Sequence, residues 1–169
     1  MSDAPDIPRP SQLWKHLSAD RRKQAAEAFW QDDNATSEQA EAIGIISQRI
    51  KFRWKSVLAM PVEKKAHYLM ALPAVSEIVA ARLLVAYHLA HQRPMMSSFL
   101  DALGIAHEDG MIADEEMKAP PEEALQKAAS AIAATYPAED VSLYLSTLVW
   151  QDPETWGALG TLPQVVTKA

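Results

Sequence analysis

Two histidines lie three residues apart in VAYHLAHQRP, residues 85–94, within the most apolar stretch of the chain. On a helix His88 and His91 share one face, and two imidazoles at that spacing can point at one metal ion. Glu77 falls on the same face, and His107 in AHEDG is a further candidate ligand. Histidines on an apolar helix more often pack and hydrogen-bond within a helix interface. We therefore expect a polar site and no bound metal or cofactor, and leave open whether the histidines converge.

Arg82 belongs to the same candidate polar site. It falls among apolar residues of the same predicted helix, where an unpaired buried charge is too costly to maintain. The guanidinium must therefore extend to solvent or meet a carboxylate. We expect that carboxylate to come from the acidic second half of the chain, with Asp101 and Asp140 as the candidates.

Basic and aromatic residues alternate in RIKFRWKS, residues 49–56. Cations bind phosphates and exposed rings stack on bases, so this composition is typical of a nucleic-acid surface. It also suits the contact surface for a protein partner. We select Arg49, Arg53 and Trp54 as candidate contact residues, with a protein partner preferred and nucleic acid as the alternative.

The predicted secondary structure weakens the nucleic-acid interpretation of this segment. Thr36 and Gln39 have the spacing of a capping box, which predicts a long helix from Ser37 to about Lys55. Apolar residues at helical spacing then place Trp54 on the buried face of that helix. Alternating cations on such a helix scatter around its axis instead of gathering on one side.

The sequence offers no recognisable catalytic motif. It contains no glycine-rich phosphate loop, no nucleophile elbow and no paired-histidine zinc motif. It also has no cysteine, which excludes disulfides, thiolate metal sites and cysteine nucleophiles. We therefore expect a protein that binds a partner and does not catalyse a reaction.

The pattern of apolar residues indicates an all-α fold of about eight helices of uneven length. The segment 73–92 is apolar on nearly all sides, which is typical of the central helix of an irregular bundle. Asp109 and Gly110 signal a tight turn, with a short β-ribbon expected near residues 105–112.

Short helices punctuated by Leu-Pro occur in MPVEKKAHYLMALP followed by VSEIVAARLL, residues 60–84. This segment resembles helical-repeat proteins, including the N-terminal superhelices of flagellar-motor proteins and magnesium transporters. The resemblance implies stacked short helices in this part of the chain. It concerns helix punctuation only, so no function is transferred from those families.

A single helical domain is expected over residues 11–160, with sub-lobes at 11–93 and 94–160. We expect a flexible arm at residues 1–10, because it holds three prolines and shows no periodicity, and a flexible tail at 161–169.

Charge is distributed unevenly between the two halves of the chain. Residues 1–93 carry thirteen Lys or Arg and ten Asp or Glu, whereas residues 94–169 carry three and twelve. This charge asymmetry can help one end of the chain dock on another molecule, or pull the two ends together.

The N-terminal MSDAPDIPRP has no apolar core, and the longest apolar run is too short to cross a bilayer, so we expect a cytoplasmic protein without a membrane partner.

Three hypotheses for function follow. The leading one is a helical adaptor that engages a protein partner or associates with itself. The alternatives are a nucleic-acid-binding protein that uses the basic N-terminal half, and a metal-dependent helical-bundle enzyme that uses His88 and His91.

Overall fold

Helices form almost all of the computed structural model, which describes residues 7–113 and 117–165. The predicted all-α class is confirmed, although within these residues there are ten α-helices and one 3₁₀ helix where about eight helices were expected. The chain divides into two compact units. We call Pro10–Ala90 the N-terminal unit, and the remaining described residues the C-terminal unit.

The N-terminal unit is built from helices of very different length. These are α1 (Pro10–His16), α2 (Ala19–Gln31), α3 (Thr36–Ile50), α4 (Trp54–Leu58), α5 (Val62–Met70) and α6 (Glu77–His91), the last of which ends one residue beyond the unit.

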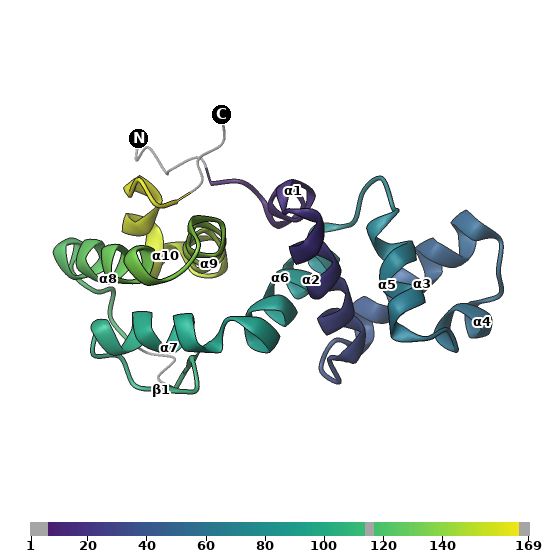
Figure 1. Ribbon diagram of the computed structural model, residues 1–169, viewed down its shortest axis with the longest axis horizontal. Coiled ribbons are helices and arrows are strands. Elements are labelled where there is room, and N and C mark those ends of the chain that lie inside the picture. Colours follow the sequence, from purple (N-terminus) through teal and green to yellow (C-terminus); the bar gives the residue numbers. More distant parts are fainter. Residues whose placement is uncertain (1–6, 114–116, 166–169) are drawn as a thin grey trace. The chain divides into compact units, whose positions relative to one another are not determined.

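Small side chains allow α2 and α5 to pack closely. Ala25 and Ala26 on α2 and Ala66 on α5 are fully or almost fully buried, together with Phe29 and Leu69. A helix face of alanines lets two backbones approach, and the larger side chains beside it fill the space that remains. Helices α3, α4 and α5 lie together in the same unit (Figure 1).

The end of α2 is bonded to the start of α3 by Gln39. Its side-chain amide donates hydrogen bonds to the backbone oxygens of Phe29, at 2.7 Å, and Asp32, at 2.9 Å. The predicted capping box of Thr36 and Gln39 is therefore wrong. The residue before α3 is Ala35, and no side chain caps this helix.

Helix α6 corresponds to the predicted apolar helix 73–92. Seven of its fifteen residues are buried, among them Leu83, Leu84 and Tyr87. It begins later than expected, because Ser76 accepts a hydrogen bond from the Val79 amide and takes the position of a helix cap. Pro73 lies before the helix and not in its first turn.

The C-terminal unit pairs longer helices with a short ribbon. Its elements are α7 (Arg93–Ala102), β1 (His107–Glu108), β2 (Met111–Ile112), α8 (Glu122–Thr135), α9 (Ala138–Gln151), α10 (Pro153–Trp156) and the 3₁₀ helix η1 (Gly157–Thr161). Helix α8 packs against both α7 and α9. The rings of Tyr144 and Trp156 both lie against that of Phe99, with centroids 5.5 and 6.0 Å away.

The predicted ribbon and its turn are confirmed. Strands β1 and β2 are antiparallel, and Asp109 and Gly110 between them have φ angles of 51° and 91°. Two successive positive φ angles are typical of the type I′ turn, which favours this pair of residues. A Cβ on Gly110 would lie 2.9 Å from Cβ of Met96, so glycine is also required there by space.

Packing extends further along the C-terminal segment than the sequence suggested. Leu162 and Val165 are buried, and the Ser142 hydroxyl donates a hydrogen bond to the Gln164 backbone oxygen at 2.5 Å. The expected flexible tail therefore does not begin at residue 161. Residues 166–169 lie outside the described residues, as do residues 1–6 of the expected arm.

Within residues 7–113 and 117–165, no helix combines the length and the apolar character that crossing a membrane requires.

Candidate functional site

The segment that alternates basic and aromatic residues is not one continuous helix. Helix α3 ends at Ile50, and Lys51 adopts the left-handed conformation, with φ 59° and ψ 34°. Phe52 is not helical, Arg53 has extended backbone angles, and α4 then starts at Trp54. The prediction of one helix as far as Lys55 is wrong for this reason.

The change of direction at Lys51 exposes several large apolar side chains. Phe52 is 46%, Trp54 44% and Leu58 47% exposed. The expectation that Trp54 packs in the interior is therefore wrong. Trp54 and Leu58 are four residues apart on α4 and so lie on one face of it.

Cations alternate with these apolar side chains along the chain. The candidates Arg49 and Arg53 are both exposed, as are Lys51 and Lys55. We call residues 49–58 the basic–aromatic corner. The structure places the three candidate contact residues in it, and adds Phe52 and Leu58, which sequence reasoning had not selected.

The corner is held in place by contacts on its inner side. Val57 is fully buried, and the Ser47 hydroxyl donates a hydrogen bond to the backbone oxygen of Phe52. From α5, the Lys65 ammonium donates to the backbone oxygen of Leu58 at 3.4 Å. The exposed side chains therefore project from a backbone with several fixed points, which limits the entropy lost on binding.

The electrostatic character of this region is strongly positive. Residues 49–65 hold six Lys or Arg against Glu63 alone. One of these cations, Lys65, also lies 5.0 Å from the ring centroid of Trp30, and partial burial lowers its pKa. A surface of this kind attracts acidic groups and favours their approach at low ionic strength.

His88 and His107 of the candidate polar site have different hydrogen-bond partners. His88 is buried, and its Nδ1 lies 2.7 Å from the Leu84 backbone oxygen in the same helix. Nε2 of His107 lies 2.6 Å from an Asp101 carboxylate oxygen, and its Nδ1 accepts a hydrogen bond from the Gly110 amide at 3.1 Å. His91 is exposed at the end of α6.

Glu77 accepts hydrogen bonds from the Ser11 amide, at 3.2 Å, and from its hydroxyl. Among the residues that the structure describes, no three His, Asp or Glu side chains are placed to hold one metal ion. The geometry therefore gives the metal-dependent alternative no support from His88 and His91.

Arg82 has a different partner from the one expected. Its Nε lies 3.7 Å from a Glu38 carboxylate oxygen, and both side chains are mostly covered. Glu38 belongs to α3 in the same unit, so the expected pairing with Asp101 or Asp140 is wrong. Asp101 is bonded to His107 instead.

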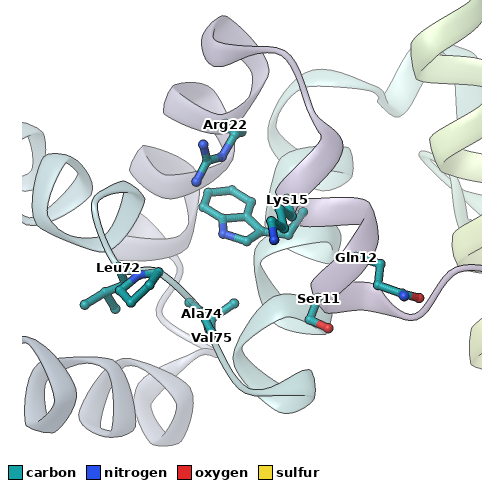
Figure 2. Close-up of a pocket in the computed structure, with 9 residues that line it drawn as sticks. Ser11, Gln12, Lys15, Arg22, Leu72, Ala74 and Val75 are labelled. Atoms are coloured by element: carbon teal, nitrogen blue, oxygen red, sulfur yellow. The ribbon is translucent and has the colours of Figure 1, made fainter.

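A second candidate site is a pocket of about 240 Å³ in the N-terminal unit. The guanidinium carbon of Arg22, which is labelled in Figure 2, lies 5.0 Å from the ring centroid of Trp14. Arg22 also donates a hydrogen bond to the Met70 backbone oxygen at 3.1 Å. Its guanidinium is therefore partly engaged by the protein, although its buried Nε has no hydrogen-bond partner among the described residues.

Comparison with known proteins gives no functional assignment, so the assignment rests on the residues of this chain. No protein-family model, curated protein or solved structure matches this chain. The basic–aromatic corner is the main candidate binding surface, because large apolar groups and cations are exposed together there.

Proposed function

We propose that this chain is a non-enzymatic helical binding module, which engages an acidic protein surface through the basic–aromatic corner. The observation that carries the proposal is the joint exposure of Phe52, Trp54 and Leu58 among cations. Water in contact with such side chains is released when a partner covers them, which favours association. The cations select acidic partners and increase the association rate.

One feature favours a protein over a nucleic acid as this partner. Leu58 is as exposed as Trp54 but has no ring to stack on a base, whereas an apolar contact in a protein interface can cover it.

Nucleic acid is retained as the second candidate because of one observation. Phe52 and Trp54 are both open to solvent, so the rings that base stacking needs are accessible. Binding of this kind has a strong salt dependence, since each phosphate contact releases counterions. A protein interface with an apolar centre loses less affinity as salt increases.

Fluorescence anisotropy with two labelled probes tests the proposal. One probe is an acidic peptide of Glu and Leu residues, and the other is an oligothymidylate of matched charge. We expect the peptide to bind more tightly, and Trp54→Ala to weaken it by roughly ten- to a hundredfold. The matched control is Trp150→Ala, because Trp150 is 39% exposed but lies in the other unit.

The cations are tested in the same assay. Arg53→Ala should weaken the peptide complex, whereas Lys23→Ala, which removes an exposed cation from α2, should leave it unchanged. Tighter and steeply salt-dependent binding of the oligothymidylate would favour the nucleic-acid candidate. If Trp54→Ala changes the affinity for neither probe, the corner is not a binding surface.

A further inference from the structure

The C-terminal unit contains an apolar pocket with acidic residues nearby, whereas the basic–aromatic corner carries cations. Its volume is about 530 Å³, within the range of roughly 300–1,000 Å³ typical of ligand pockets. It lies between the segment that follows α7 and the segment that leads into α8. We call it the C-terminal hollow, and its lining includes Leu103, Ile105, Met117, Pro120 and Ala124.

The lining is apolar with one exception. Leu103, Ile105 and Met117 are each partly exposed, and Lys118 is the cation among the lining residues. Gly104 has a φ of 69°, and the Ile105 amide donates a hydrogen bond to the Leu100 backbone oxygen at 3.0 Å. This left-handed turn ends α7 and fixes one wall of the hollow.

Acidic residues dominate the sequence around the hollow. The described residues of this stretch, 101–113 and 117–124, contain five Asp or Glu against Lys118 alone. Two of these acids, Glu122 and Glu123, are exposed in the first turn of α8, directly after the lining segment. The corner has the reverse pattern, with exposed rings in the middle and six cations against one acid in residues 49–65.

We propose that the hollow receives the basic–aromatic corner of a second copy of this chain. Trp54 of one copy would enter the apolar hollow of the other, while the cations of the corner face the acids around it. An apolar anchor in a pocket with complementary charges at its edge is the usual arrangement of a specific interface. This inference rests on the proposed function of the corner and names a copy of the chain as the partner.

Sedimentation velocity over a range of protein concentrations is the first test. The wild-type chain should pass from monomer to a larger species as concentration increases, and added salt should shift this transition to higher concentration. Trp54→Ala should weaken the association by about 30- to 100-fold. Trp150→Ala should leave it unchanged.

A mixture of two variants gives the sharper test. Trp54→Ala removes the anchor but keeps the hollow, and Ala124→Trp fills the hollow but keeps the anchor. Each variant alone should remain monomeric, and an equimolar mixture should form a one-to-one complex. Glu122→Gln combined with Glu123→Gln provides a milder second variant of the hollow, expected to weaken association by a few-fold. Circular dichroism confirms that each variant is folded.

Three results would overturn the inference. They are a wild-type chain that stays monomeric at every concentration, a mixture of the two variants that does not associate, and an association that Trp54→Ala leaves unchanged. If the chain stays monomeric but binds the acidic peptide through Trp54, the proposed function stands and only the second copy is excluded. If Trp54 affects neither assay, both proposals fail.

Discussion

Gln39 links the end of α2 to the start of α3, and α3 leads into the basic–aromatic corner. Its amide nitrogen makes two hydrogen bonds, of 2.7 and 2.9 Å, to backbone oxygens at the end of α2. An intramolecular hydrogen bond contributes about 1 kcal/mol net. Gln39→Ala should therefore lower the free energy of unfolding by about 2 kcal/mol, which for a chain of this size corresponds to roughly 4–8 °C in Tm.

Gln39→Glu should be more harmful at neutral pH, although it preserves the shape of the side chain. An ionised carboxylate accepts hydrogen bonds and cannot donate them, so it would face the backbone oxygens of Phe29 and Asp32 without a bond. The Asp32 carboxylate lies at the same joint, and one of its oxygens is buried without a hydrogen-bond partner. A second negative charge there adds repulsion to the lost bonds.

The pH dependence of this variant has a definite sign. Protonation returns one donor to the Glu side chain and removes its charge, so the folded state favours the protonated form. The extra loss of stability is thus absent below the ordinary glutamate pKa of about 4.3 and develops as the pH rises above it. Gln39→Glu should be less stable than Gln39→Ala at pH 7, and should be at least as stable as Gln39→Ala at about pH 4.

Urea denaturation followed by tryptophan fluorescence measures these differences. Gln48→Ala is the matched control, because Gln48 is an exposed glutamine on the same helix, and it should change stability by less than about 0.5 kcal/mol. The reasoning is refuted if Gln39→Ala behaves like this control, or if Gln39→Glu is as stable as the wild type at pH 7.

Three further predictions concern individual residues. Lys51→Gly should raise the Tm, by a change worth up to about 1 kcal/mol, because Lys51 has a φ of 59° that glycine adopts without strain; a lower Tm would contradict the left-handed turn. Gly110→Ala should cost about 1–3 kcal/mol in urea denaturation, since the residue combines a φ of 91° with a Cβ position 2.9 Å from Met96; an unchanged midpoint would exclude this geometry. Burial raises the pKa of the Tyr144 phenol, so it should stay protonated in the folded chain while unfolded chains lose the proton near pH 10, the ordinary tyrosine value. Stability should consequently fall as the pH rises above about 10, and Tyr144→Phe should reduce that fall; an ultraviolet titration in which every tyrosine ionises normally in the folded chain would contradict the burial.

The fold class was predictable because helical signals dominate the sequence. The apolar segment 73–92 and the Asp109–Gly110 turn each carry a clear local pattern, and the structure has a helix over Glu77–His91 and the tight turn. The break between α3 and α4 carries no such signal. The helical spacing of Ile46, Ile50 and Val57 continues across it, and the left-handed residue is Lys51, where glycine would have marked the end of the helix.

The candidate site was only partly predictable for the same reason. The spacing correctly implied that Val57 is buried, but it implied the same for Trp54, which is exposed because the chain changes direction at Lys51. Charge balance between the two halves suggested a distant carboxylate for Arg82, whereas packing of α3 supplied Glu38. Which carboxylate lies nearest to a cation depends on three-dimensional packing, and composition does not encode it.

The most direct measurement for the central claim is an NMR titration of the tryptophan indole signals with the acidic Glu–Leu peptide. The chain has five tryptophans, and single substitutions assign their signals. If the corner is the contact surface, the Trp54 indole shifts in a saturable way, while those of Trp30, Trp150 and Trp156 stay in place. A peptide that binds without moving the Trp54 signal, or that moves the Trp150 signal in its place, would contradict the claim.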